Sequence, residues 1–335
     1  MALRNLALAI LTALAVSFAA AVTQAAEFKP AIVYDLGGKF DKSFNEGVYD
    51  GATKFKQDTG NDFREFEIQN DAQREQAMRN FARRGLSPIV APGFSQAAAM
   101  EKVAKEFPDT QFAIIDMVVD LPNVTSIVFK EQEGSYLVGI LAAMASKTGK
   151  VGFVGGMDVP LIRKFACGYV QGAKETNPDI EIYQNMTGTT GAAWSDPVKG
   201  GELAKSQFDR GADVVYHAAG GTGLGVLQAA ADAGKLGIGV DSNQNHLHPG
   251  SVLTSMLKRV DIAVYDVFNA AMEGTLKPGI QALGLAEDGV GWALDNNNLL
   301  LITEEMQSAA EEARQAIIDG SISVHDYMSD SDCPH

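Results

Sequence analysis

The stretch AIVYDLGGKFDKSFNEG, residues 31–47, decides the fold. Its first four residues form an apolar run typical of a buried strand, and this run ends on Asp35. The Gly37-Gly38 pair permits a sharp reversal of the backbone. Ser43 and Glu46 have the spacing of a capping box and predict that a helix begins there. The Asp35 carboxylate is therefore expected at the carboxyl end of a strand, where open α/β sheets bind ligands.

The same alternation of short apolar runs and helical segments continues along the chain and predicts parallel sheets with helices on both faces. In the first half, the further predicted strands are 63–68, 88–91, 111–115 and 124–129, and the predicted helices are 47–59, 71–84, 95–106 and 134–146. The pattern then restarts with strands at 151–154, 180–185, 214–217 and 236–240 and helices at 161–175, 197–210 and 224–233. The last part contains an extended run at 252–257, a helix at 260–272, a strand at 290–294 and a helix at 303–319.

The length of the chain indicates two lobes, because about 310 residues after the N-terminal segment exceed what one core usually holds. We expect lobe 1 to contain residues 26–128 plus about 258–280, and lobe 2 to contain residues 129–257 plus about 281–320. No low-complexity linker separates them, so several short crossings are expected to join the lobes. The remaining tail, residues 321–335, is polar and is expected to be loose.

The N-terminal segment, residues 1–25, is typical of a secretory signal peptide. Arg4 precedes an apolar run from Leu6 to Val22, and small residues surround an expected cut after Ala25. The run is rich in alanine and lacks a basic flank, which favours a cleaved signal over a membrane anchor. No cysteine lies near the cut, so the sequence predicts an exported chain that is not lipid-anchored.

Charge and cysteine content exclude some classes of function. Without Arg4 the formal charge changes from −15 to −16, and such an acidic chain is a poor candidate for binding nucleic acid. The two cysteines, Cys167 and Cys333, could pair in an oxidising compartment. Because they are far apart in sequence, burial of Cys167 as a small apolar residue is favoured over a disulfide.

Three acidic residues, Asp35, Asp116 and Asp241, each end an apolar run. A carboxylate at such a position can accept hydrogen bonds from the hydroxyl or ring N–H groups of a ligand. Each one alone is better explained as a helix cap or a turn residue. Together they favour a ligand site at the edge of the sheets.

Aromatic and glycine-rich segments extend this candidate site. Trp194 lies in a glycine-rich loop before a helix and is suited to stacking on a flat ring, and Phe44 could supply the opposite face. The glycines from Gly220 onward follow a strand, but Val226 stands where a dinucleotide fingerprint needs its third glycine. We therefore expect no cofactor, and a loop whose bare backbone at Gly221 approaches a ligand closely.

No catalytic or metal-binding pattern stands out. His246 and His248 lack a third ligand at a suitable spacing, so no metal site is expected. No serine lies in a nucleophile elbow, and no catalytic residue is assigned.

Six segments carry a resemblance to a known family. In order along the chain, DLGGKFDKSFNEG, FAIIDMVVD, EGSYLVGILAA, AAGGTGLGV, GVDSNQ and VLTSMLKRVD resemble the basic membrane protein (BMP) family of ABC-transporter substrate-binding proteins. The best-understood type in this family is the purine nucleoside receptor lipoprotein. The resemblance spans about Ala31 to Asp319. It implies a type I periplasmic-binding-protein fold, with two doubly wound parallel-sheet lobes joined by hinge crossings.

The resemblance also implies roles for individual residues. Contacts to base and ribose are implied for Asp35, Phe44 and Asn45, a base-reading carboxylate for Asp116, and a pair that holds the ribose hydroxyls for Asp241 and Lys258. Trp194 falls where the nucleoside receptor has a stacking phenylalanine. We expect Lys258 to offset the negative potential of Asp35 and Asp241. The chain departs from the family in its larger stacking ring and in the missing lipobox cysteine, which implies a free periplasmic protein.

The implied function is that of a receptor and not of an enzyme. Two lobes would close on a purine nucleoside and deliver it, as a monomer, to an ABC permease in the inner membrane. Within the same class, a receptor for a free purine base is the alternative. A secreted nucleoside hydrolase would need a general acid and base poised on the ribosyl bond. A sensor domain that feeds a signalling partner also fits the sequence.

Overall fold

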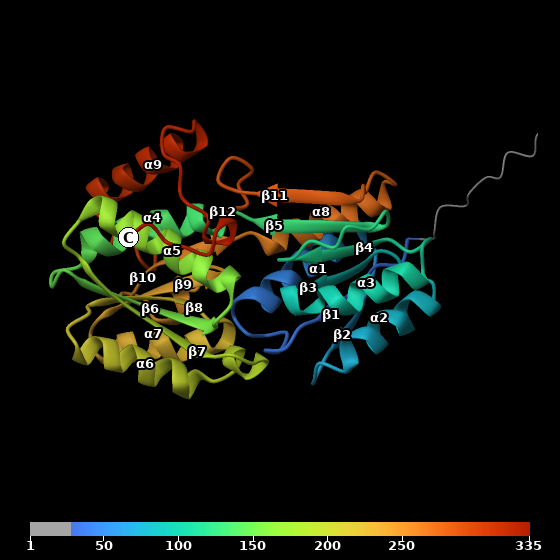
Figure 1. The fold of residues 1–335 in the computed structure, drawn as a ribbon, viewed down its shortest axis with the longest axis horizontal. Helices are drawn as coiled ribbons and strands as arrows, with labels where there is room; N and C mark the ends of the chain where they lie inside the picture. The colour runs from blue at the N-terminus through green and yellow to red at the C-terminus, as the bar shows by residue number, and fades with distance from the viewer. Residues whose placement is uncertain (1–27) are drawn as a thin grey trace, which may run out of the picture.

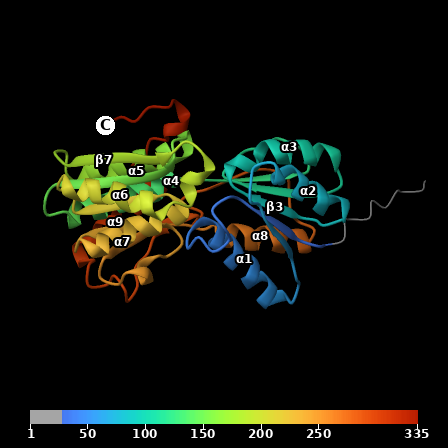
Figure 2. The ribbon, with the colours of Figure 1, turned by 90° about the horizontal axis from the view of Figure 1, so that it is seen from below.

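The computed structural model describes residues 28–335, and Figures 1 and 2 show two lobes joined side by side. The predicted signal peptide, residues 1–25, lies outside the described residues. Each lobe is a six-stranded sheet covered by helices on both faces, and the sheets are predominantly parallel. The predicted fold class, two α/β lobes with parallel sheets, is confirmed.

The sheet of the first lobe has the strand order β11-β5-β4-β3-β1-β2, and all its pairings are parallel. Its strands are β1 (Ala31–Tyr34), β2 (Arg64–Glu67), β3 (Ile89–Pro92), β4 (Phe112–Ile115), β5 (Val124–Phe129) and β11 (Gly279–Leu283). One face packs on α1 (Phe44–Thr59) and α8 (Val260–Met272), and the other on α2 (Gln73–Arg83), the 3₁₀ helix η1 (Phe94–Gln96) and α3 (Ala97–Glu106). The alternation along β1 explains this: Ile32 and Tyr34 pack with α1, whereas Ala31 and Val33 pack with α2 and α3.

The second lobe has the strand order β12-β10-β9-β8-β6-β7, in which only β12 is antiparallel. Its strands are β6 (Lys150–Met157), β7 (Glu181–Gly188), β8 (Val214–Ala218), β9 (Leu236–Asp241), β10 (Val252–Lys258) and β12 (Val290–Trp292). On one side lie α4 (Glu131–Ala145), α5 (Pro160–Thr176) and α9 (Glu304–Ile318), and on the other α6 (Pro197–Asp209) and α7 (Gly223–Asp232). Short 3₁₀ helices follow the strands at η2 (Gly191–Trp194), η3 (Gly220–Thr222) and η4 (Asn245–Leu247).

Three crossings connect the lobes: β5 to α4, β10 to α8, and β11 to β12. They lie against one another, since the Lys130 N–H donates to the Leu283 carbonyl at 2.9 Å and the Arg259 N–H to the Gly289 carbonyl at 2.8 Å. The side chain of Glu133 accepts the N–H of Leu285 at 2.8 Å and ties the first crossing to the third. The hinge is thus a hydrogen-bonded bundle of three chain segments.

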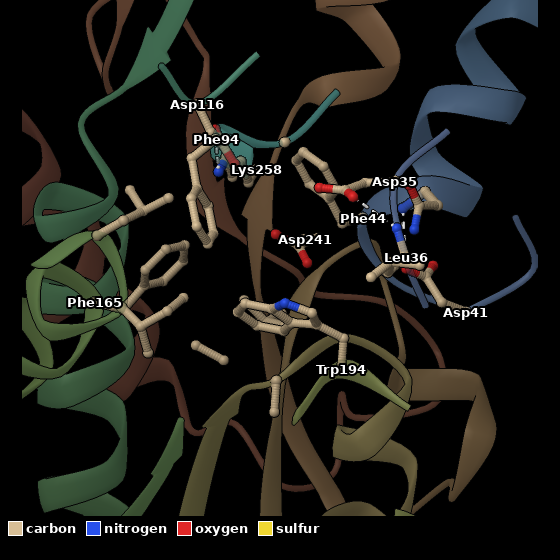
Figure 3. A pocket seen from close by; sticks show the side chains of 18 residues that line it. Asp35, Leu36, Asp41, Phe44, Phe94, Asp116, Phe165, Trp194, Asp241 and Lys258 are labelled. Atoms are coloured by element: carbon tan, nitrogen blue, oxygen red, sulfur yellow. Dashed lines mark hydrogen bonds and ion pairs between the residues drawn. The ribbon is translucent and has the colours of Figure 1, made fainter. Parts of the chain in front are cut away.

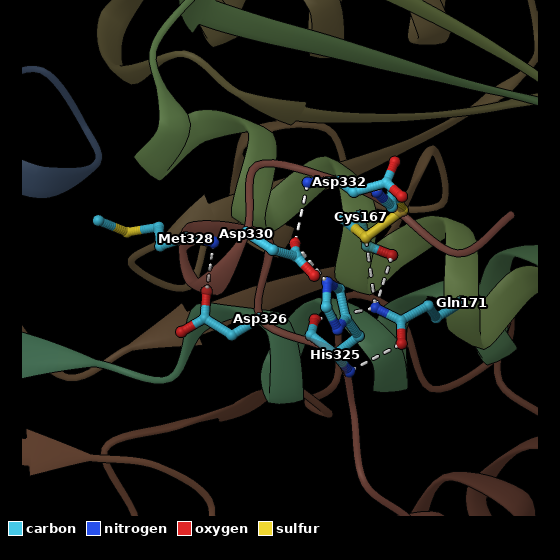
Figure 4. Close-up of polar contacts among 8 residues, drawn as sticks. Cys167, Gln171, His325, Asp326, Met328, Asp330 and Asp332 are labelled. Atoms are coloured by element: carbon cyan, nitrogen blue, oxygen red, sulfur yellow. Dashed lines mark hydrogen bonds and ion pairs between the residues drawn. A yellow bond between two sulfur atoms is a disulfide. The ribbon is translucent and has the colours of Figure 1, made fainter.

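The C-terminal tail is ordered and packs on α5, so the prediction of a loose tail is wrong (Figure 4). Cys333 forms a disulfide with Cys167, with 5.7 Å between their Cα atoms, which also corrects the preference for an unpaired Cys167. The side-chain amide of Gln171 donates to the carbonyl of His325 at 3.0 Å and accepts its N–H at 2.8 Å. A last 3₁₀ helix, η5 (Tyr327–Ser329), follows this contact.

Within residues 28–335, none of the helices combines the length and the apolar character needed to cross a membrane.

Candidate functional site

A cavity lies between the lobes, at the carboxyl ends of the central strands of both sheets (Figure 3). Seven of the eight residues predicted from the sequence line it: Asp35, Phe44, Asn45, Asp116, Trp194, Asp241 and Lys258. Residues from parts of the chain more than 200 positions apart therefore meet in one place.

The eighth predicted residue, Gly221, is not on the cavity wall. Gly220 lines the cavity instead, and its φ of 54° is a conformation that favours glycine. Gly221 is buried behind it, and a Cβ there would lie 3.2 Å from the carbonyl oxygen of Trp194. The glycine loop thus packs against the backbone of Trp194.

Asp35 is held by residues of its own lobe. Its Oδ1 accepts hydrogen bonds from Arg74 Nη2 at 2.6 Å and from the Leu36 N–H at 2.8 Å, and its Oδ2 accepts one from the Ser95 hydroxyl. Arg74 is itself buried and also pairs with Asp71. This arginine, which was not expected from the sequence, neutralises Asp35 and fixes its orientation at the cavity wall.

The capping box expected from Ser43 and Glu46 is not formed. Asp41 caps α1 instead: its carboxylate accepts the backbone N–H groups of Ser43 at 2.9 Å, Asn45 at 3.1 Å and Glu46 at 3.1 Å. Glu46 reaches back to the N–H of Lys42, at 3.1 Å. Burial raises the pKa of Asp41 to about 6, although the three N–H donors oppose this rise.

The Ser43 hydroxyl, released from capping, crosses to the other lobe. It donates to Asp241 Oδ2 at 2.5 Å, and the Ser242 hydroxyl donates back to the Ser43 carbonyl at 2.8 Å. The side-chain amide of Gln244 adds a bond of 2.9 Å to the carbonyl of Lys42. Lys42 and Asp241 have left-handed φ values of 61° and 63°, which non-glycine residues adopt mainly where the surroundings enforce them. These contacts hold the lobes together on this side of the cavity.

Lys258 forms ion pairs with two carboxylates. Its Nζ lies 2.6 Å from Asp116 Oδ1 and 3.0 Å from Glu131 Oε1, whereas the sequence analysis expected it to offset the potential of Asp35 and Asp241. Burial lowers the pKa of Lys258, but Asp116, Glu131 and Asp241 together outweigh burial and raise it above the ordinary value. Lys258 is therefore an ammonium, and it still acts on Asp241 through its field.

The remaining carboxylates that line the cavity are those of Asp116 and Asp241. Burial raises the pKa of Asp116 above its usual value, and the neighbouring ammonium of Lys258 opposes that rise. Burial also raises the pKa of Asp241, to about 6, while Lys258 and the Ser43 hydroxyl act to lower it. Asp116 has a left-handed φ of 72°, like Asp241. Both side chains are aimed from the ends of central strands into the cavity (Figure 3).

Four aromatic rings border the cavity: Phe44, Phe94, Phe165 and Trp194 (Figure 3). Phe94 and Trp194 form an edge-to-face pair with ring centres 6.5 Å apart. Phe44 has Lys258 Nζ 5.2 Å from its ring centre, in cation–π distance. Phe94 and Phe165 were not expected from the sequence, because nothing in their local pattern separates them from core aromatics.

Trp194 packs against Gly156 of strand β6. A Cβ at Gly156 would lie only 2.1 Å from Cζ3 of the indole, so the ring occupies the space that any other residue would fill. The small residues Ala218 and Ala219 at the end of β8 also line this part of the cavity.

The arrangement suits the binding of a flat polar molecule. It offers carboxylate acceptors, an ammonium donor, aromatic surfaces and the buried Asn45 Oδ1, which has no hydrogen-bond partner in the described structure. His217 is fully buried outside the cavity wall, bonds to Gln244 at 2.9 Å, and has its pKa lowered by burial to about 4. Among residues 28–335 there is no group of three or more His, Cys, Asp or Glu side chains placed to hold a metal ion.

Comparisons with known proteins agree with this geometry. The family model described as "Bmp: ABC transporter substrate-binding protein PnrA-like" matches residues 28–327. The "ABC transporter nucleoside-binding protein BmpA" of Lactococcus lactis subsp. cremoris is 34% identical over 89% of this chain and 89% of its own. An "Uncharacterized lipoprotein" of Pyrococcus abyssi is 36% identical over 82% of this chain and 71% of its own. Among solved structures, a solute-binding protein of an ABC transporter system from Aeropyrum pernix K1 superposes with a TM-score of 0.81 and 30% identity, covering 88% of this chain and 92% of that one.

Proposed function

Since the chain belongs to the Bmp family of ABC-transporter substrate-binding proteins, we propose that it binds a purine nucleoside between its lobes and delivers it to an ABC permease. The single observation that carries this proposal is the cavity itself. Its aromatic walls suit a flat ring, and its carboxylates and ammonium suit a sugar with neighbouring hydroxyl groups. The nucleoside-binding relative from Lactococcus lactis supports the same ligand class.

The charges in the cavity favour a neutral ligand over a phosphorylated one. Four carboxylates line the cavity, Asp35, Asp41, Asp116 and Asp241, against one lysine. Arg74 neutralises Asp35 from behind, but Asp241 has no cationic partner in direct contact among the described residues. A phosphate group would be repelled by this surplus, whereas hydroxyl and ring N–H groups would find acceptors.

We further propose that the protein acts as a monomer in the periplasm, without a cofactor and without catalysis. Export would follow from the signal-like residues 1–25. Both cysteines of the sequence are joined in the disulfide, whereas relatives from Pyrococcus are named lipoproteins.

The test is to identify what the protein carries and what it binds. Small molecules released from freshly purified, denatured protein are analysed by mass spectrometry. Calorimetry then compares guanosine, inosine and adenosine with guanine. Nucleoside binding without binding of the free base supports the proposal. Tight binding of guanine alone would assign the protein to free purine bases, and release of free base from added nucleoside would make it a hydrolase.

A further inference from the structure

A chain of four alternating charges runs from the cavity into the hinge. Asp116 pairs with Lys258 at 2.6 Å, Lys258 with Glu131 at 3.0 Å, and Glu131 with Lys164 at 3.0 Å. The exposed fractions of these side chains are only 7%, 2%, 1% and 8%, in the same order. Two carboxylates and two ammonium groups balance, so the chain as a whole is neutral.

The members of this charge chain come from both lobes and from the crossings between them. Asp116 follows β4 in the first lobe, and Lys164 lies in α5 of the second. Lys258 ends β10 and Glu131 begins α4, at two of the three crossings. Lys164 Nζ also donates to the carbonyl of Phe129, the last residue of β5, at 2.7 Å. The contacts therefore exist only while the hinge holds this arrangement.

Two carboxylates lie within ion-pair distance of the Lys258 ammonium, Asp116 on the cavity side and Glu131 on the hinge side. The rings of Phe44, Phe129 and Phe165 surround the ammonium, with centres at 5.2, 5.2 and 5.5 Å. Lys258 lines the cavity, so its ammonium, which has three N–H donors, can also donate to a ligand.

We propose that Glu131 and Lys164 are positioning residues of the binding site, and this inference rests on the proposed nucleoside-binding function. Glu131 holds Lys258 so that one N–H group meets a ribose hydroxyl. Lys164 neutralises the other oxygen of Glu131, which would otherwise be a buried unpaired charge. Neither residue is on the cavity wall, so both act on the ligand through Lys258.

The charge balance allows a matched set of variants. Glu131→Gln leaves Lys164 with only the partly exposed Asp326 as a carboxylate partner, 3.5 Å away, and Lys164→Met leaves Glu131 with one partner only. Each single variant therefore buries an unbalanced charge and should lower the melting temperature. The double variant removes one negative and one positive charge and should recover most of that loss, while Lys258 still lacks its hinge-side anchor.

The control is Arg163→Met, one position away on α5. Arg163 pairs with Asp158 at 2.7 Å on the surface of the second lobe and is not on the cavity wall. This variant tests whether the loss of any ion pair on α5 is enough to change the affinity for the ligand. All four variants and the wild type are measured by thermal melting and by calorimetry with guanosine and 2′-deoxyguanosine.

We expect the double variant to melt close to the wild type and yet to bind guanosine about tenfold more weakly, with a smaller preference over 2′-deoxyguanosine. Arg163→Met should keep both affinities. A double variant with wild-type affinity and wild-type preference overturns the inference, as does a loss of affinity that disappears together with the loss of stability. If the wild type binds no nucleoside at all, the proposed function fails instead, and the melting data alone then report on the charge chain.

Discussion

Trp194 can lie against β6 only because residue 156 has no side chain. The six-membered part of the indole sits where a Cβ would be, at 2.1 Å. The ring is rigid, so a methyl group there cannot be accommodated by a small rotation of a flexible chain. The position of the largest aromatic surface in the cavity therefore depends on a glycine of another strand.

Gly156→Ala should push the indole toward the ligand space and weaken nucleoside binding by about tenfold or more, since base–aromatic stacking is worth about 1–3 kcal/mol. Intrinsic fluorescence of Trp194, recorded in a Trp292→Phe background, should change in the same variant. Gly291→Ala is the control, because a Cβ there meets no atom within 4 Å. Unchanged fluorescence and affinity in Gly156→Ala would contradict the packing of the Trp194 ring against Gly156.

We expect the affinity for the proposed nucleoside to depend on pH through Asp241. Burial raises its pKa to about 6, so it loses its charge as the solution becomes mildly acidic. If the protonated form does not bind, affinity should fall about fourfold between about pH 7.5 and about pH 5.5. Asp241→Asn should bind weakly at both pH values and show a flatter profile. Asparagine tolerates the left-handed φ of 63° at this position, so the backbone can be kept.

The stability of the unliganded protein should change with pH in the opposite sense. The pKa of Asp241 is higher in the folded protein than its ordinary value of 3.8. Its contribution to stability is therefore fully present below about pH 4 and is lost as the pH rises through about 6. Relative to Asp241→Asn, the wild type should gain melting temperature on acidification while it loses affinity. Parallel changes in both quantities would contradict the assignment.

The acidic residues at the ends of apolar runs could be identified from the sequence. Two basic side chains that pair with buried carboxylates could not. Asp35, Asp116 and Asp241 follow predictable strands, which is why they were assigned to one edge. Arg74 and Lys164 lie in helices that read as ordinary amphipathic surfaces. Arg74 pairs with Asp35, which is 39 positions away in the sequence, and Lys164 pairs with Glu131, which is 33 positions away. Local patterns hold no information about such pairs.

At the scale of elements, the cap of α1 lies on a different residue from the one that the sequence predicted. Asp41 caps the helix, and Ser43 bonds across to Asp241 at 2.5 Å. Both have side chains that cap helices well, and the capping-box spacing to Glu46 favoured Ser43. The choice depends on the second lobe, whose strand β9 brings an acceptor to Ser43.

Ser43→Ala should leave the cap of α1 intact but remove the bond between the lobes. We expect a melting temperature close to the wild type for the unliganded protein, because the lobes can separate, and about tenfold weaker nucleoside binding. Asp41→Asn should instead cost about 1 kcal/mol of stability through the weakened cap. Calorimetry and thermal melting distinguish the two. A Ser43→Ala protein with normal affinity and reduced stability would show that Ser43 acts within its own lobe.

The elements missed or shifted in the sequence analysis share a physical cause. Strand β11 (Gly279–Leu283) is an edge strand with four exposed residues, so it lacks the apolar run that marks a buried strand. Helix α4 begins at Glu131 and not at residue 134, because its first turn is charged although it is buried. Because the predicted helix began at residue 134, the sequence analysis missed Glu131, which pairs with both Lys258 and Lys164. By contrast, α8 begins and ends where its apolar pattern predicted.

At the scale of the whole molecule, the tail is bound to the helix that forms part of the cavity wall. Lys164, Cys167 and Gln171 share one face of α5, and the tail meets them through Asp326, Cys333 and His325. Leu161, Ile162 and Phe165 of the same helix line the cavity. The tail thus holds α5 through residues that do not line the cavity.

Replacing both cysteines by alanine should destabilise the protein by about 5 kcal/mol in the loop-entropy description, since the bridged residues are 166 positions apart. Nucleoside affinity should change little, because neither cysteine lines the cavity. Urea unfolding with and without a reductant measures the effect. The reductant should destabilise the wild type and leave the double variant unchanged. Equal unfolding of the wild type in both conditions would contradict a structural role for the bridge.

The same bridge turns residues 167–333 into a covalent ring. Strands β10 and β12 and helix α8 lie inside this ring, so two of the three connections between the lobes are part of it. A protease that cuts once anywhere within the ring leaves a single molecule whose fragments separate on a gel only after reduction. Exposed loops between residues 167 and 333 can therefore be nicked without releasing either fragment.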